Sequence, residues 1–403
     1  MFLLDEANRC LLCKNPRCSA NCPISTSIPE VISLYKEGKL KEAGEILFNN
    51  NPLSVICSIV CPHENQCAGN CIRGIKGEPI QFYEIEKEIS ERYLDEVKFE
   101  NVPKTKGRVA IIGGGPAGLT IAFVLAKRGY RITIFDSKNK IGGVLRYGIP
   151  EYRLPNILID KLEDKLIELG VKIRPNTLIG PVISIDRLFE EDYKAIFIGT
   201  GVWNPRTLNI KGETLGNAHF AIDYLRSPET YRLGKRVAVI GAGNVAMDAA
   251  RTAKRNNEVE EVTILYRGNF EDMSATKKEI EEAKEEGVIF KLFRSPLEIT
   301  EDGVKLINKE DNIEGIEEFF ECDSTIIAIS QSPRNNIVSN TTKLETNSSG
   351  LIIADERGNT TRPGVFSSGD VVTGAKTVVE AVAYAKTVAD AMEEYCESQN
   401  FYV

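Results

Sequence analysis

Two different patterns of apolar and polar residues divide the chain near residue 100. Before that point apolar side chains recur at helical spacing, which predicts amphipathic helices over Ile28–Glu37, Lys39–Asn49 and Ile80–Tyr93. After a polar linker at Asn101–Gly107, short β-branched runs alternate with glycine turns and helical segments. The chain is therefore predicted to join a helical N-terminal domain to an α/β region.

The α/β region uses one unit twice, a strand followed by a glycine turn, a helix and a second strand. The first copy is predicted at Arg108–Ile112, Ala117–Arg128 and Arg131–Phe135. The second copy is predicted at Lys235–Ile240, Val245–Arg255 and Glu261–Leu265. Later strands are expected at Asp323–Ile329 and Val365–Ser367, before a helix that runs from Thr377 to about Tyr395.

The first glycine turn has the pattern of a dinucleotide-binding loop. Its sequence Gly113-x-Gly115-x-x-Gly118 follows a strand and opens a helix. Glycine allows a tight turn and close approach of the backbone to a pyrophosphate, and the helix N-terminus attracts the phosphates. Asp136 ends the next strand, where a carboxylate accepts hydrogen bonds from a ribose. The residues predicted to bind this nucleotide are Gly113, Gly115, Pro116, Ala117, Gly118 and Asp136.

The second turn, Gly241-x-Gly243-x-x-Ala246, predicts another nucleotide site. Alanine at its third position is a common variant for nicotinamide nucleotides. Arg267 ends the following strand, where a guanidinium pairs with a 2′-phosphate and favours NADP over NAD. A solvated surface arginine is the alternative interpretation.

Cysteines are concentrated near the N-terminus, where eight of the ten lie within the first 71 residues. Closely spaced thiolates converge on a soft metal centre with little loss of loop entropy. Cys-Pro pairs, as in ferredoxins, favour two 4Fe–4S clusters. Two zinc sites and disulfides are the alternatives, although only one Cys-x-x-Cys pair is present. The two groups are Cys10-x2-Cys13-x4-Cys18-x3-Cys22-Pro23 and Cys57-x3-Cys61-Pro62-x4-Cys67-x3-Cys71.

Composition excludes several classes of function. The net charge of −8 and the pI near 5.3 argue against a nucleic-acid binder, which needs clustered Lys and Arg. Only two histidines are present, so histidine-based metal chemistry is not expected. The uncharged stretch Val109–Ala126 contains the first glycine turn and is interpreted as strand, turn and helix, not as a membrane span. No signal-like N-terminus is recognised, and a cytoplasmic location is expected.

These motifs predict three domains. Residues 1–100 form a helical iron–sulfur domain, residues 101–225 and 330–403 an FAD domain, and residues 226–329 an NAD(P) domain inserted into it. Gly369 and Asp370, before the last helix, are expected at the ribityl or phosphate region of FAD. The N-terminus of that helix is expected to face the flavin, where negative charge develops on reduction.

One segment of the chain resembles a sequence motif of a known protein family. The run Gly142-Gly143-Val144-Leu145-Arg146-Tyr147-Gly148-Ile149-Pro150-Glu151-Tyr152-Arg153-Leu154-Pro155 resembles the hallmark of the glutamate synthase small-subunit family. The resemblance covers essentially the whole chain. The runs Ala7–Cys13 and Lys376–Val382 are most similar to the FAD and iron–sulfur subunits of bacterial NAD-dependent dihydropyrimidine dehydrogenases.

The resemblance implies a ligand set for the clusters. Cys10, Cys13 and Cys18 would bind one cluster, and Cys22 would join Cys61, Cys67 and Cys71 on the other. A Glu or Gln on the following helix fills the remaining place in the family, and counting along this chain puts Glu86 there. If Cys57 is a ligand instead, Glu86 is released.

The resemblance also implies nucleotide contacts. For FAD these are Asp136, Gly143, Val144, Arg153, Gly369, Asp370, Thr377 and Val378, the last two near the flavin. For the nicotinamide nucleotide they are Gly241, Ala242, Gly243, Asn244, Val245, Arg267, Ala328, Ile329 and Ser330. NADPH-specific members carry further basic residues after Arg267, whereas this chain reads Gly268-Asn269-Phe270-Glu271-Asp272, which weakens the case for NADPH.

The predicted function is an electron-input subunit. Hydride transfer from NAD(P)H to FAD needs positioning of two stacked rings and no protein acid or base. The chain has no room for an FMN-binding barrel of ~250 residues beside these domains, so a partner subunit, possibly containing FMN, would reduce the substrate. A dihydropyrimidine dehydrogenase-like partner is favoured. Glutamate synthase, another complex of the family, and a redox sensor without turnover are the alternatives.

Overall fold

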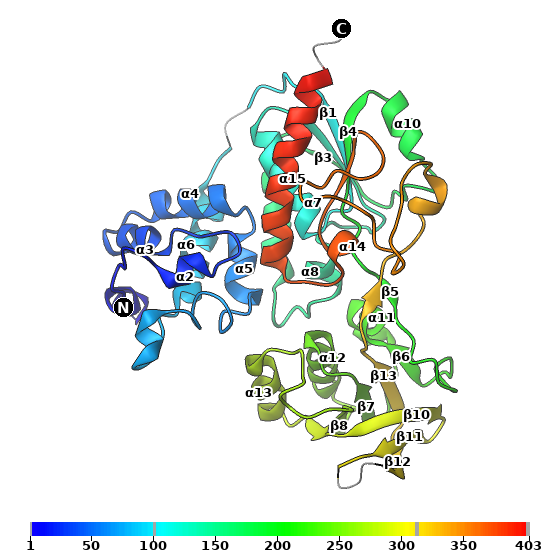
Figure 1. The fold of residues 1–403 in the computed structure, drawn as a ribbon. Helices are drawn as coiled ribbons and strands as arrows, with labels where there is room; N and C mark the ends of the chain where they lie inside the picture. Colours follow the sequence, from blue (N-terminus) through cyan, green and yellow to red (C-terminus); the bar gives the residue numbers. More distant parts are fainter. Residues whose placement is uncertain (1, 100–101, 311–313, 400–403) are drawn as a thin grey trace. The chain divides into compact units, whose positions relative to one another are not determined.

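The computed structural model describes residues 2–99, 102–310 and 314–399, so Asn101 of the predicted linker lies outside the described residues. Contacts divide the chain into two units. The first comprises Met1–Leu145, Glu151–Val202 and Pro333–Val403, and the second comprises Arg146–Pro150 and Trp203–Ser332. Figure 1 labels the elements of both units.

The first unit begins with short helices, coloured blue to cyan in Figure 1. Their buried faces meet in one cluster that contains Val31, Leu47 and Ile85, as the helical spacing of apolar residues predicts. The helices are α1 (Phe2–Asn8), α2 (Arg17–Ala20), α3 (Ile28–Lys36), α4 (Leu40–Asn50), α5 (Ser54–Val60), the 3-10 turn η1 (Ile72–Ile75) and α6 (Phe82–Glu96).

A parallel sheet of order β15-β4-β1-β2-β3 forms the rest of the first unit. Its strands are β1 (Arg108–Ile112), β2 (Arg131–Phe135), β3 (Lys172–Arg174), β4 (Tyr193–Ile198) and β15 (Val365–Ser367). Its helices are α7 (Pro116–Lys127), α8 (Val144–Tyr147), α9 (Asn156–Glu168), α10 (Ile185–Glu190), α14 (Asp370–Thr373) and α15 (Val378–Gln399), with the 3-10 turn η3 (Val338–Asn340). Strand β15 follows the whole second unit in sequence and pairs with β4.

Specific contacts join the N-terminal helices to this sheet domain within the first unit. Phe48 of α4 meets Phe123 of α7 edge to face, with ring centroids 5.3 Å apart. The Nζ of Lys386 on α15 donates to the backbone oxygen and to Oδ1 of Asn50, at 2.6 and 2.9 Å. These contacts hold α4 of the cysteine-rich N-terminal region against α7 and α15.

The second unit has its own parallel sheet, of order β6-β13-β7-β8-β9. A strand–glycine turn–helix unit lies at its centre, as predicted. Its strands and helices are β5 (Asn204–Pro205), β6 (Ala218–Phe220), α11 (Ala221–Arg226), η2 (Pro228–Thr230), β7 (Arg236–Ile240), α12 (Asn244–Lys254), β8 (Glu261–Leu265), α13 (Lys277–Glu285), β9 (Ile289–Lys291), β13 (Ser324–Ile327) and β14 (Gln331–Ser332).

Two features of the second unit differ from the sequence analysis. The unit begins at Trp203, whereas the predicted domain begins at 226, because β6 pairs with β13 and α11 packs on α12. An antiparallel meander, absent from the predictions, is built from β10 (Arg294–Thr300), β11 (Gly303–Asn308) and β12 (Ile316–Glu321).

The uncharged stretch Val109–Ala126 folds as predicted, as most of β1, a glycine turn and most of α7. Its side chains are mostly buried in the first unit. Among the described residues, no helix has the length and apolar character needed to cross a membrane.

Candidate functional site

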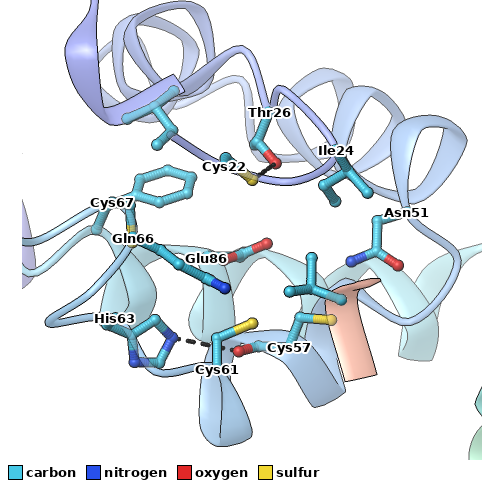
Figure 2. Close-up of a pocket in the computed structure, with 13 residues that line it drawn as sticks. Cys22, Ile24, Thr26, Asn51, Cys57, Cys61, His63, Gln66, Cys67 and Glu86 are labelled. Carbon is cyan, nitrogen blue, oxygen red and sulfur yellow. Dashed lines mark hydrogen bonds between the residues drawn. The ribbon is translucent and has the colours of Figure 1, made fainter. Parts of the chain in front are cut away.

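A pocket between the N-terminal helices and the first turn of α15 gathers Cys22 and three cysteines of the second group, Cys57, Cys61 and Cys67 (Figure 2). It encloses about 340 Å³ of empty space, part of it open to solvent. Cys22 follows α2, Cys57 lies on α5 and Cys61 directly follows α5, so the local helices direct these thiols to one place. The lining residues are Cys22, Ile24, Thr26, Ile28, Asn51, Cys57, Cys61, His63, Gln66, Cys67, Phe82, Glu86 and Val379.

Electrostatic effects show how close these groups lie. A hydrogen bond between the Cys57 and Cys61 thiols, followed by burial, raises the pKa of Cys61 well above its usual value. Burial and then the charge of Glu86 raise the pKa of Cys67 to about 12. The free thiols of Cys61 and Cys67 are therefore protonated, and a metal centre would bind them by displacing protons.

Glu86 is the unusual member of the pocket. It lies on α6 with only 7% of its surface exposed, and burial followed by the nearby Cys57 raises its pKa well above the usual value. Its carboxyl group makes no hydrogen bond or ion pair with any described residue. A buried carboxyl group without a compensating partner is costly, and it is an oxygen donor available to a metal.

A second thiol group contains Cys10, Cys13, Cys18 and Cys71. Burial is the main cause that raises the pKa of Cys10, and the charges of Cys13 and Cys71 add to it. Burial also raises the pKa of Cys18, with added effects from Cys71 and Cys10. Cys71 precedes η1, and its Sγ accepts the Ile80 N–H at 3.5 Å.

These neighbours group the side chains differently from the ligand sets that the resemblance implies. Cys71 lies with the Cys10 group, and Glu86 lies with Cys22, Cys61 and Cys67. Cys71 and Glu86 have exchanged places between the two groups, and the role of the eight residues as ligands stays a prediction. Counting positions along the chain could not reveal this, because the turn between Cys67 and Cys71 directs these two thiols to different groups.

The spread of the donors bears on the type of metal centre. Within the parts of the chain that the structure describes, no three His, Cys, Asp or Glu side chains converge enough to hold one metal ion. A zinc ion draws four donors to within about 2.3 Å of itself. In a four-iron cluster each cysteine binds a different iron, so the sulfurs stand further apart. Thiolates grouped in this way are the donors that iron–sulfur clusters take, so the donor chemistry of both groups is compatible with 4Fe–4S clusters.

The first glycine loop fits a dinucleotide. A Cβ atom on Gly118 would lie 2.0 Å from the Gly113 oxygen, and one on Gly113, at φ +99°, would lie 2.6 Å from the Gly199 oxygen. At Gly115 a Cβ atom would meet only the Gly143 Cα, at 3.7 Å. The loop thus packs tightly on the sheet and leaves space in front of the α7 N-terminus, where Pro116 and Ala117 begin the helix.

Among the other predicted FAD residues, Asp136 contacts the glycine loop directly. Asp136 Oδ2 and Oδ1 accept the Gly114 and Lys138 N–H groups, both at 2.8 Å. Burial raises its pKa, against the lowering effect of these hydrogen bonds. Two acceptor positions of the carboxylate remain for ribose hydroxyls. Val144 begins α8, and Arg153 lies between α8 and α9.

The C-terminal segment reaches the same loop. A Cβ atom on Gly369 would lie 3.2 Å from the Ala117 Cβ, so the two predicted FAD segments adjoin. Burial raises the pKa of Asp370 to about 6, and its Oδ1 accepts the Lys376 N–H at 3.2 Å. Thr377 and Glu380 form a capping box at the start of α15, with the Thr377 N–H and hydroxyl donating to Glu380 Oε2.

The second unit repeats the arrangement. A Cβ atom on Gly241, at φ +141°, would lie 2.3 Å from the Ala328 oxygen, so glycine is required there. Gly243 precedes α12, and Asn244 Oδ1 accepts the Thr276 N–H at 3.0 Å. Ala242 and Val245 adjoin them in the loop and first turn. The loop therefore has the form that a nicotinamide nucleotide requires.

The remaining predicted nucleotide residues lie at the ends of β8 and β13. Arg267 follows β8, is exposed, and forms no ion pair or hydrogen bond with another described residue. Ala328 and Ile329 follow β13, and Ser330 has a φ of +90°, which is strained for a serine. Backbone strain of this kind occurs at ligand-binding sites, which makes Ser330 a residue to test.

Two buried polar groups near these sites were not predicted from the sequence. Neither Ser368 Oγ, beside Gly369, nor Asn51 Nδ2, in the pocket of Figure 2, has a hydrogen-bond partner among the described residues. A serine or an asparagine at these positions does not by itself indicate a functional site in the sequence. Only the fold shows that they are buried and unpaired.

Comparison with known proteins decides the family. Residues 107–385 match the profile of the pyridine nucleotide-disulphide oxidoreductases. The chain belongs to this family. Residues 2–98 match the profile of dihydropyrimidine dehydrogenase domain II, 4Fe-4S cluster. The protein is therefore an FAD-dependent oxidoreductase with an N-terminal iron–sulfur domain, as the motifs predict.

Full-length relatives agree. The glutamate synthase [NADPH] small chain of Escherichia coli K12 is 31% identical over 97% of this chain and 91% of its own length. The NAD-dependent dihydropyrimidine dehydrogenase subunit PreT of E. coli O157:H7 is 32% identical over 98% of this chain and 95% of its own. The resemblance to the glutamate synthase small-subunit family is confirmed.

Solved structures support the fold. FprA of Mycobacterium tuberculosis in complex with NADPH is 17% identical and aligns over 73% of this chain and 86% of its own, with a TM-score of 0.62. A 2-naphthoyl-CoA reductase complex is 20% identical and aligns over 90% of this chain and 49% of its own, with a TM-score of 0.61.

Proposed function

We propose that the chain is an electron-input subunit that oxidises NAD(P)H through FAD and two 4Fe–4S clusters and delivers electrons to a partner reductase subunit. When bound, FAD accepts a hydride from the nicotinamide and releases electrons singly to the clusters. In this proposal the segment between β4 and β15 carries the NAD(P) domain, inserted into the FAD domain. The partner is dihydropyrimidine dehydrogenase-like and holds the substrate site.

One observation carries the proposal. Val379, in the first turn of α15, lines the same pocket as Cys22, Cys61 and Glu86. The preceding residue, Val378, begins α15 and is the residue expected beside the flavin. A cluster in the pocket would therefore adjoin the helix N-terminus assigned to FAD, which supports a short electron path between them.

The other thiol group supports an exit for electrons. Leu11 lies between Cys10 and Cys13, and Ile75 lies four residues after Cys71 with 63% of its surface exposed. Exposed apolar side chains of this kind mark contact surfaces. The exposed apolar residues beside this thiol group are Leu11, Leu12, Ile72 and Ile75, which we call the exit face.

The nucleotide assigned to the second unit is NADPH. The exposed Arg267 side chain supports this choice, because a guanidinium binds a 2′-phosphate through two parallel hydrogen bonds. The acidic residues that follow, Glu271 and Asp272, oppose it. A direct comparison of NADPH and NADH as electron donors separates the two.

A glutamate synthase small subunit is the second candidate. It is favoured by the 31% identity that spans 91% of the E. coli protein. The two candidates differ in the partner, an FMN protein that reduces pyrimidines or a glutaminase-type subunit.

Co-purification with the native partner tests the proposal. The complex is isolated anaerobically, and the partner is identified by mass spectrometry. NADPH-dependent reduction of uracil by the complex supports the first candidate, and glutamine-dependent glutamate formation supports the second. NADPH-dependent dye reduction by the isolated chain is expected in both cases, and its absence from fully loaded protein would contradict the proposal.

A further inference from the structure

Asn51 follows α4 and is held in one orientation inside the pocket of Figure 2. Its side chain is buried, with 1% of the residue exposed. Oδ1 accepts the Leu53 N–H at 2.9 Å, and the Asn51 N–H donates to the Leu47 oxygen at 2.7 Å. Only the amide oxygen accepts a hydrogen bond, so the Leu53 contact assigns the oxygen and nitrogen positions.

The amide nitrogen is left with two unused donors. Among the residues that the structure describes, Asn51 Nδ2 has no hydrogen-bond partner. Figure 2 shows this nitrogen turned toward the interior of the pocket and the oxygen turned away. Buried amide groups are nearly always paired. The unused donors therefore indicate that an acceptor occupies the pocket in the loaded protein.

The neighbouring Asn50 shows that the unused donors are specific to Asn51. Asn50 Nδ2 donates to the Ile24 oxygen at 3.1 Å and to Thr26 Oγ1 at 3.5 Å. Thr26 Oγ1 in turn lies 3.3 Å from Cys22 Sγ. The Asn50 amide nitrogen thus has hydrogen-bond acceptors within the protein and supports the loop that carries Cys22. The Asn51 amide nitrogen instead points into the space that the thiols surround.

We propose that Asn51 donates an N–H···S hydrogen bond to the iron–sulfur cluster held by Cys22, Cys61, Cys67 and Glu86 and raises its reduction potential. This inference rests on the proposed function, which puts a cluster in the pocket. Hydrogen bonds to cluster sulfurs stabilise the more negative, reduced form. Asn51 is a positioning and tuning residue in this account and binds no iron.

The test removes the Asn51 amide nitrogen, the proposed donor, and keeps a side-chain oxygen that accepts the Leu53 N–H. Asn51→Ser retains an oxygen for the Leu53 N–H but has no group that reaches into the pocket. Asn51→Asp retains the shape and replaces the amide nitrogen by an acceptor. Asn49→Ser is the matched control, because Asn49 is exposed on the same helix. Midpoint potentials are measured by mediated titration followed by electron paramagnetic resonance, with iron content measured on the same samples.

In Asn51→Ser the ratio of reduced to oxidised cluster at a fixed potential is expected to fall about tenfold, a shift of about −59 mV for one electron. The cluster affected should be the one whose signal is lost in Cys61→Ser. Asn51→Asp should shift the same cluster in the same direction, and Asn49→Ser should shift neither.

An unchanged potential in a fully loaded Asn51 variant would overturn the inference. Loss of the cluster from both Asn51 variants would also overturn it, because Asn51 would then be needed for assembly and not for tuning. If wild-type protein holds no cluster that depends on Cys61, the proposed function itself fails, and iron analysis distinguishes this outcome.

Discussion

Glu86 on α6 and Cys57 on α5 line one buried pocket, with 7% and 3% of their surfaces exposed. Cys22, Cys61 and Cys67 complete the pocket's donor set. Either Glu86 or Cys57 would therefore supply the fourth ligand of a cluster. The proposed function assigns this place to Glu86 and leaves Cys57 as a neighbouring thiol.

Replacing Glu86 should affect one cluster only. Glu86→Ala is expected to lose or distort the cluster of the Cys22 group, lowering iron and sulfide toward about half of the wild-type content, while FAD stays bound. Cys57→Ala should have a milder effect, because it removes a neighbour and no ligand. Iron, sulfide and FAD analysis of both variants decides the assignment. Loss of a cluster in Cys57→Ala, with full content in Glu86→Ala, would reverse it.

Asp370 should make FAD-free protein less stable as the pH rises. Burial raises its folded pKa to about 6 from the ordinary 3.8, so the folded state binds the proton more tightly than the unfolded state. The free energy of unfolding therefore falls between about pH 4 and pH 6 and is constant above that. Asp370→Asn should remove this loss and stabilise FAD-free protein at pH 8 by up to about 3 kcal/mol.

Denaturant unfolding at pH 5, 6 and 8 measures this effect. Asp355→Asn is a control of opposite sign, because Asp355 is exposed: desolvation raises its pKa, but hydrogen bonds from Asn359 and from the Arg357 N–H together bring the pKa below its usual value. That variant should lose stability at neutral pH. An Asp370→Asn variant that is less stable than wild type at pH 8 would contradict the account.

Arg267 should discriminate between the two nicotinamide nucleotides. Loss of one charge-assisted contact costs on the order of 1.5–3 kcal/mol, roughly 10- to 150-fold in affinity. Arg267→Ala should raise KM for NADPH by about this factor and leave KM for NADH nearly unchanged. Arg232→Ala, also exposed in the second unit, should change neither. Wild-type protein that prefers NADH would overturn the assignment of NADPH.

The exit face should matter for the partner and not for the nucleotides. Ile75→Asp puts a charge on an apolar contact surface and is expected to weaken partner binding by about tenfold or more. NADPH-dependent dye reduction should be unchanged. Val182→Asp, 75% exposed in another part of the first unit, is the matched control. Equal weakening by both variants would show that the effect is not specific to this face.

Local signals predicted the two strand–turn–helix–strand units that carry the glycine loops, but not strands such as β4 (Tyr193–Ile198) that complete the sheets. Strands such as Arg108–Ile112 and Arg131–Phe135 were predicted with their observed bounds. A run of β-branched residues bounded by turn residues strongly favours a strand over other secondary structure. The meander over residues 294–321 was missed, since its exposed faces interrupt the apolar pattern. The short strand β6 was also missed, because pairing with β13 and not its own sequence defines it.

Some residues of the candidate site could likewise be predicted from local sequence motifs, and others could be recognised only from the fold. Spacing identified the cysteines and the glycine loops, because each motif is local in sequence. The exchange of Cys71 and Glu86 between the two groups depends on how η1 and α6 pack, which spacing does not encode. Asn51 and Ser368 became candidates only when the fold showed that their polar atoms are buried without a partner.

The central claim is that one chain holds FAD and two 4Fe–4S clusters. It is tested most directly by measuring iron, acid-labile sulfide, zinc and released flavin on one anaerobically purified sample. Two clusters with four irons each predict about eight iron and about eight sulfide per chain, with one FAD and no FMN. Stoichiometric zinc without iron, iron for one cluster only, or FMN as the flavin would contradict the account.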